Sequence, residues 1–215
     1  MPRTLFICFI LLTTFATTSE AAHRCGTPCP PGLIEVKDCD ENRRPPCFCT
    51  CEETSQALEI SRFTTSTLTD ADADQILADV GRVLSRKDGA SDIACMLTLV
   101  RNGNVTVFDF GNGIINSQSD LDSLFGAGLP GKVRVINQIS FCGGFKPNII
   151  GCAANGTPQV VVRHTPTEEG ILWAHEYGHT RNLPHRDSDP VAVMHPTIIP
   201  SHLQVTNGEC KAFLK

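Results

Sequence analysis

The stretch that decides the fold of this chain reads HEYGHTRNLPH and spans residues 175–185. His175 and His179 are four positions apart, so a helix puts both on one face, where they can bind one metal ion. Glu176 lies one step around the helix, close enough to hold a water molecule on that ion. His185 follows six residues after His179 and supplies a third imidazole. Because catalytic zinc sites use three protein ligands and a water, the pattern predicts one catalytic Zn²⁺ bound by these three histidines.

The helix that carries this stretch is predicted over about 166–181. Thr165-Pro166-Thr167-Glu168 is typical of a capping box at its start. Thr165 would cap the first turn, Pro166 fits the first helical position, and Glu168 would reach back to the cap.

The end of this helix must be sharp, because the chain has to reverse after Arg181 for His185 to reach the ion. Asn182 suits the left-handed conformation that such a turn requires. Pro184 then prevents the helix from resuming. The sequence therefore predicts a positive φ angle at Asn182.

The whole pattern resembles the long zinc signature of the metzincin metalloproteases, in which a glycine stands where this chain has Asn182. Metzincins also have a methionine turn beneath the metal, and Met194 would take that place here. The resemblance covers residues 165–196. It implies an α+β catalytic domain in which a twisted mixed sheet and two main helices precede a small, irregular C-terminal subdomain.

Two other features depart from the family pattern. Arg186, directly after the third histidine, points to no particular metzincin subfamily. Some metzincins place a tyrosine shortly after the methionine turn as an extra contact, but the single tyrosine of this chain is Tyr177. Zinc alone would therefore be the main electrophile.

The activity that the resemblance implies is that of a secreted zinc endopeptidase. Zinc lowers the pKa of its water toward about 7 and polarises a substrate carbonyl. Glu176 would act as general base, taking the proton of that water and passing it to the leaving amine. The expected partner is a protein or peptide substrate. His195 and His202 are expected to be structural or exposed, and His164, just before the helix, is expected to lie at the surface.

Residues 1–21 resemble a secretory signal peptide with a positive start, an apolar run and a small residue at the cleavage position. The apolar run is too short for a membrane span, although an uncleaved anchor is the alternative. The chain of 215 residues has a formal net charge of −5 and no basic block. We therefore expect a secreted monomer that binds neither nucleic acid nor, after cleavage, a membrane.

The cysteines form two groups once Cys8 leaves with the signal peptide. Six crowd into residues 25–51, and four are spread through the rest of the chain. Ten cysteines in a secreted chain predict five disulfides, with a clustered zinc site as the rival interpretation of the first group. Cys142 and Cys152 flank a stretch rich in glycine and are a plausible pair.

The stretch Arg24-Cys25-Gly26-Thr27-Pro28 resembles the cysteine-switch peptide of matrixin proenzymes, in which a thiolate binds the zinc. No long propeptide precedes it, and a free Cys25 would leave an odd number of cysteines. We expect a disulfide at Cys25, with a switch as the alternative.

The rest of the chain divides into a cysteine-rich segment over 22–55 and a metzincin-like domain over 56–215. A strand is predicted over 57–64, and a helix from Thr69 and Asp72 to Gly89. Apolar runs at 93–100 and 104–110, around Asn102-Gly103, predict a hairpin. Further strands are expected over the ranges 132–140, 149–154 and 158–163.

Two alternative functions remain open. The chain could be a non-catalytic binding protein on a metalloprotease fold, although Glu176 and all three histidines are present. Residues 25–51 could instead be the functional part, as a disulfide-rich inhibitor or targeting module.

Overall fold

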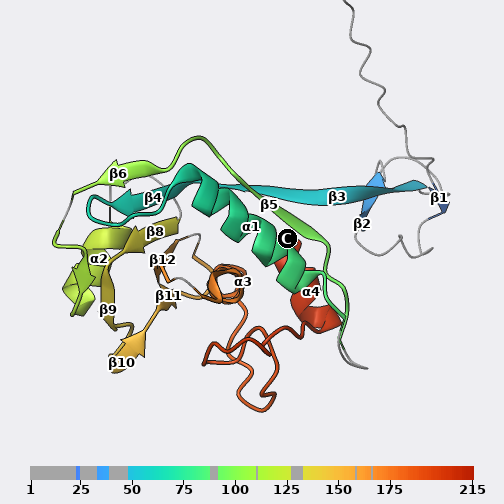
Figure 1. Ribbon diagram of the computed structural model, residues 1–215. Coiled ribbons are helices and arrows are strands. Elements are labelled where there is room, and N and C mark those ends of the chain that lie inside the picture. Colours follow the sequence, from blue (N-terminus) through green and yellow to red (C-terminus); the bar gives the residue numbers. More distant parts are fainter. Residues whose placement is uncertain are drawn as a thin grey trace, which may run out of the picture.

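The computed structural model describes residues 23–24, 33–38, 48–87, 92–109, 111–126, 133–157, 159–165 and 167–215. The segment expected to be a signal peptide and Cys25 lie outside these ranges, as do parts of the cysteine-rich segment. The described residues form a mixed α+β structure, as predicted (Figure 1). Its helices are α1 (Asp70–Leu84), α2 (Gln118–Phe125), α3 (Glu169–Thr180) and α4 (Asn207–Phe213).

The strands form several sheets. The largest has the order β11-β12-β8-β4-β6, in which β11 is antiparallel to β12 and the other neighbours are parallel. It comprises β11 (Gly151–Ala153), β12 (Val160–Arg163), β8 (Val133–Ile136), β4 (Ile60–Phe63) and β6 (Thr106–Phe108).

Two smaller sheets flank it. One joins β1 (His23–Arg24), β2 (Leu33–Asp38) and β5 (Leu97–Arg101) to the long strand β3 (Phe48–Leu58). The other has the order β10-β9-β7, from β10 (Phe145–Ile149), β9 (Gln138–Phe141) and β7 (Ile114–Ile115). β3 runs through the position at which the sequence suggested a division between segment and domain.

The predicted hairpin around Asn102-Gly103 is wrong. β5 and β6 do not pair with each other; β5 runs parallel to β3, and β6 runs parallel to β4. The chain therefore keeps its direction through this stretch, and the amide of Asn102 donates to the carbonyl of Leu58 at 2.8 Å. Gly103, with φ 76°, lies between β5 and β6 and interrupts the extended backbone without reversing the chain. The turn residues Asn102 and Gly103 suggested a reversal of the chain, but the pairing of β5 with β3 and of β6 with β4 determines its path.

Helix α1 begins where the sequence predicts. Thr69 is its N-cap, and Thr69 and Asp72 form a capping box. The helix ends at Leu84, before the predicted limit at Gly89. Its apolar face is buried and includes Ile76, Leu77, Val80 and Val83.

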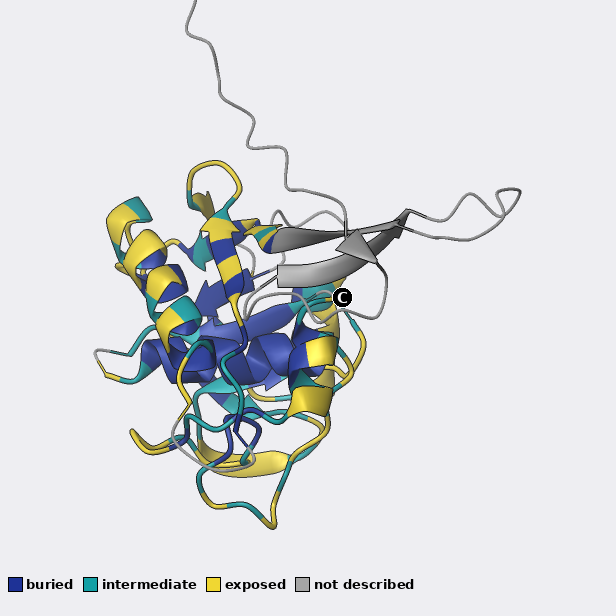
Figure 2. Ribbon diagram, turned by 90° about the vertical axis from the view of Figure 1, so that its right-hand side faces the viewer, coloured by how far each residue is buried: buried dark blue, intermediate teal, exposed yellow. Residues whose placement is uncertain are grey.

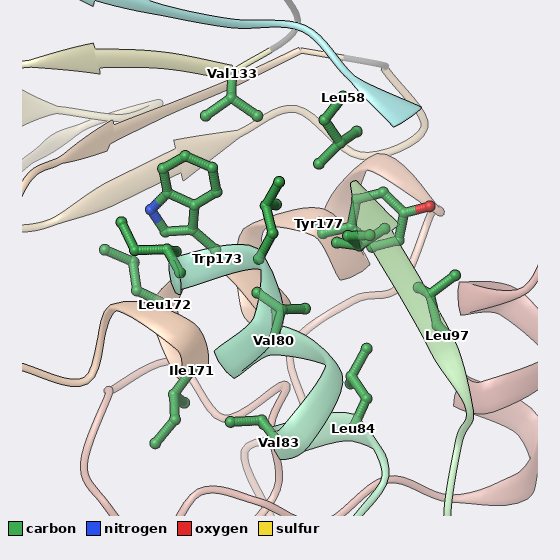
Figure 3. Packing of buried hydrophobic residues seen from close by; sticks show 14 of the residues in the cluster. Leu58, Val80, Val83, Leu84, Leu97, Val133, Ile171, Leu172, Trp173 and Tyr177 are labelled. Atoms are coloured by element: carbon green, nitrogen blue, oxygen red, sulfur yellow. The ribbon is translucent and has the colours of Figure 1, made fainter. Parts of the chain in front are cut away.

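The main core lies between α1, α3 and the strands. Trp173 and Tyr177 of α3, Val80 of α1 and Val133 of β8 belong to one buried cluster (Figure 3). Buried residues gather at the centre of the molecule, and exposed ones lie around it (Figure 2). Residues 169–179 of α3 are all buried, so the helix that carries two of the predicted ligands is the central element of the core.

The segment after α3 contains little regular structure besides α4, which the sequence did not predict. Cys210 of α4 forms a disulfide with Cys95, across 115 residues of sequence. Cys142 and Cys152 form a second disulfide, which confirms the predicted pair. None of the helices in the described part of the chain has the length and apolarity needed to cross a bilayer.

Candidate metal centre

The start of α3 differs from the prediction. Glu168 is the N-cap, with φ 61°, and no side chain caps the helix. The hydroxyl of Thr165 donates to the carbonyl of Thr167 at 3.1 Å and so does not reach the helix. His164 and the largely buried Glu169 are paired instead, with Nδ1 2.9 Å from Oε1. This pair stands at the start of α3, where the capping box was predicted. His164 is half-buried, so the expectation of a surface residue was wrong.

The first two predicted ligands are fixed by backbone carbonyls. The Nδ1–H of His175 donates to the carbonyl of Val193 at 2.8 Å, and that of His179 donates to the carbonyl of Leu183 at 2.8 Å. Because a carbonyl only accepts, each Nδ1 carries the proton and each Nε2 keeps its lone pair. Both rings are buried on the same face of α3. The outer bonds therefore leave two imidazoles in the form that binds a metal.

The third histidine reaches the same point through the predicted turn. Asn182 has φ 64°, which confirms the left-handed conformation. The amide of Asn182 donates to the carbonyl of His179 at 2.9 Å, and that of Leu183 donates to the carbonyl of Gly178 at 3.0 Å. These bonds end α3 and reverse the chain, which brings His185 back across the helix.

The three imidazoles converge. Nε2 of His179 lies 3.1 Å from Nε2 of His175 and 3.2 Å from Nε2 of His185. Around a tetrahedral ion with bonds of 2.0–2.1 Å, ligand atoms are about 3.3 Å apart. Among the described residues, these three form the one group of histidines, cysteines or acids that is able to hold a metal ion. The donor set and its spacing fit zinc.

The electrostatic environment keeps these imidazoles neutral. Burial lowers the pKa of His175 from its usual value to about 3. Burial also lowers the pKa of His179, and partial burial of its ring lowers the pKa of His185, although that residue as a whole is exposed. Neutral imidazole is the form that binds a metal, so these lowered pKa values favour the ligand form.

Glu176 lies on the same helix and points into the interior. Its side chain is buried, and burial raises the pKa of its carboxyl to about 8. Its Oε2 has no hydrogen-bond partner within the described structure. A buried polar atom without a partner is costly, so a hydrogen bond to this oxygen would be stabilising.

Met194 packs against Gly178 of α3, the helix that carries two of the candidate ligands. It is fully buried, and a Cβ added at Gly178 would lie 3.1 Å from its Cε and closer still to its Sδ. Gly178 therefore allows α3 to approach Met194 closely. The amide of Arg186 donates to the carbonyl of Met194 at 2.8 Å, which ties the turn to the residue after His185.

The other histidines of this region do not join the group of three. The rings of His195 and His202 are 4.8 Å apart, and Nδ1 of His202 donates to the carbonyl of Thr197 at 2.6 Å. His202 is buried and His195 is half-buried. Both agree with the structural role expected from the sequence.

Tyr177 lies on α3 away from the three imidazoles. Its hydroxyl accepts from Nε of Arg181 at 2.9 Å and donates to Gln56, and its ring stacks on Phe213. It therefore supports packing between α3, β3 and α4.

Sequence reasoning missed two carbonyls and one glycine that shape the site: those of Val193 and Leu183, and Gly151. A carbonyl leaves no signature in a sequence because every residue has one. Comparison of the chain with models of protein families and with curated proteins gave no match.

Proposed function

We propose that this chain is a zinc-dependent endopeptidase of the metzincin type. The observation that carries the proposal is the convergence of the Nε2 atoms of His175, His179 and His185, the first two of which lie on the helix that also carries the buried Glu176. Three neutral imidazoles and a carboxyl without a partner are what metal-assisted hydrolysis requires of a protein.

His175, His179 and His185 would hold the zinc ion. When bound, zinc supplies a Lewis acid that polarises a carbonyl and lowers the pKa of a water molecule to about 7. The hydrogen bonds from Nδ1 to backbone carbonyls orient the two helical rings and raise the basicity of their Nε2 atoms.

Glu176 would be the general base. It takes a proton from the attacking water and delivers it to the amine that leaves when the peptide bond breaks. Its high pKa belongs to the protein without a metal, and a nearby dication favours the carboxylate. Its surroundings exclude bulk water, so the proton it holds is available to the leaving amine.

Two features favour the metzincin type within the zinc hydrolases. The chain reverses at Asn182 between the second and third histidines, and Met194 packs beneath the helix. The disulfides agree with secretion, because such bonds persist in oxidising compartments.

The direct test combines zinc analysis with cleavage of a random peptide library. We expect one zinc per chain and hydrolysis that a chelator abolishes. Glu176→Ala should lower the rate by about 10²–10⁴-fold while zinc stays bound. Glu59 is exposed, and Glu59→Ala should leave the rate unchanged. Full activity in a zinc-loaded Glu176→Ala protein would refute the proposal.

The ligand set has its own test. His185→Ala should weaken zinc binding, because two imidazoles remain. The matched control is His195→Ala, which should retain one zinc per chain because His195 lies outside the group of three. A His185→Ala protein with unchanged zinc affinity would place the third ligand elsewhere.

A further inference from the structure

The side chain of Glu176 is packed against the backbone of strand β11. A Cβ added at Gly151 would lie 2.7 Å from both Cγ and Cδ of Glu176, and closer still to Oε1. Real Cβ atoms do not approach other atoms this closely. The Glu176 carboxyl therefore occupies the space that a side chain at position 151 would fill.

Gly151 is required at this position for space rather than for backbone conformation. Its φ is not among the positive values, and its backbone pairs with Val162 in an ordinary antiparallel register. Any residue could adopt this extended conformation. The glycine is explained by the approach of Glu176.

Strand β11 is held in place by its neighbours, so it does not readily move away from Glu176. It pairs with β12 along its length, and the amide of Arg163 donates to the carbonyl of Ile150 at 2.8 Å. The next residue, Cys152, is buried and bonded to Cys142. On the other side, α3 is fixed by the core. A larger residue at 151 would therefore move the carboxyl rather than the strand or the helix.

We propose that Gly151 is a positioning residue for the general base. The space left by its missing side chain, which we call the slot, fixes where the Glu176 carboxyl lies. This inference rests on the proposed function for its catalytic consequence. The contact itself does not, because it exists in the protein without metal or substrate. A carboxyl displaced by about 1 Å from its productive place loses much of its effect on proton transfer.

The catalytic arm of the test is Gly151→Ala in the zinc-loaded protein. We expect kcat to fall by about 10–100-fold, while KM and the zinc content stay within about twofold. The control is Gly144→Ala, because a Cβ at Gly144 meets no atom within 4 Å and the backbone there has no positive φ. That variant should keep the full kcat. Full kcat in Gly151→Ala would overturn the proposal.

The thermal arm needs no activity and uses a double-mutant cycle in the metal-free protein. Gly151→Ala should lower Tm by roughly 2–10 °C through overpacking. In a Glu176→Ala background the same substitution should lower Tm by only about 1 °C, because the slot is then empty. Equal losses in the two backgrounds would overturn the proposal.

The two arms separate this inference from the proposed function. If the wild-type protein cleaves no peptide, the proposed function fails, and the thermal cycle still decides whether Glu176 fills the slot at Gly151. If Gly151→Ala does not fold, recovery of folding in Gly151→Ala/Glu176→Ala would support the contact. Failure of the double variant to fold as well would overturn it.

Discussion

Two regions of the molecule supply the candidate metal ligands, and they are stabilised in different ways. His175 and His179 lie on α3, whose residues 169–179 are all buried in the main core. His185 is exposed and lies in a segment with little regular structure. The helical ligands are held by packing along the whole element. The third ligand depends on a few particular contacts.

Those contacts can be named. Asn182 provides the left-handed turn, Arg186 forms an ion pair with Glu209 of α4, and Cys210 of α4 is bonded to Cys95. Each acts at one point, so one substitution should loosen the third ligand while the first two stay in place. A single site can therefore combine a ligand pair fixed by helix geometry with a ligand fixed by tertiary contacts.

The largest expected effect comes from the disulfide that ties the segment after α3 to Cys95 of the main core. Replacing both Cys95 and Cys210 by alanine should lower the free energy of unfolding by about 4–5 kcal/mol, because the bond closes a loop of more than 100 residues. Removing the bond between Cys142 and Cys152, which are 10 residues apart, should cost about 3 kcal/mol. Urea unfolding measures both. If removal of the Cys142–Cys152 bond lowered the free energy of unfolding more than removal of the Cys95–Cys210 bond, the stabilising role assigned to the long loop would be wrong.

The second prediction concerns the buried region and pH. Burial raises the pKa of Glu176 to about 8 from an ordinary value near 4.5. The neutral group therefore contributes stability that is complete below about pH 4.5 and is lost as the pH rises through 8. In the metal-free protein, Glu176→Gln should gain stability over wild type across this window, on the order of a few kcal/mol.

Chemical unfolding at a series of pH values, with a chelator present, measures this difference. Glu59→Gln, at an exposed position, is the control and should show no such trend. A constant difference between wild type and Glu176→Gln from pH 5 to 9 would contradict the burial of an uncharged carboxyl.

The third prediction tests the turn that carries His185. Asn182→Val should cost about 1–3 kcal/mol and weaken zinc binding, because a β-branched residue is strained at φ 64°. Asn182→Gly should keep both properties, since glycine adopts this conformation freely. Thermal unfolding and zinc titration distinguish the two variants. Equal zinc affinity in both would mean that the left-handed turn does not position the third ligand.

The smallest effect is expected at the ion pair beyond His185. Nη1 of Arg186 lies 2.7 Å from Oε2 of Glu209, and both side chains are largely buried. Arg186→Met should cost about 1–2 kcal/mol. Arg82 pairs with Asp79 on the surface of α1, so Arg82→Met should cost less than about 0.5 kcal/mol. Similar costs for the two variants would show that the segment after α3 depends no more on this contact than α1 does on its surface pair.

Some parts of the fold follow from local sequence signals. The start of α1 at Thr69 and the conformation of Asn182 were predicted, because capping boxes and left-handed turns depend on neighbouring residues. The hairpin around Asn102-Gly103 and the cap at Thr165 were wrong. In the first place, pairing with the distant strands β3 and β4 prevailed. In the second, the pair of His164 and Glu169, five residues apart, took the place of the expected cap.

The residues of the candidate site could be predicted from the chain alone, because the spacing of His175, Glu176 and His179 encodes neighbouring positions on a helix. The way in which they are held could not be predicted, because it depends on the folded structure. The carbonyls that orient the rings come from Val193 and Leu183, and the slot for Glu176 comes from Gly151 on another element. The physical reason is that side-chain periodicity is local, whereas close packing and ring orientation depend on atoms that meet only when the chain folds.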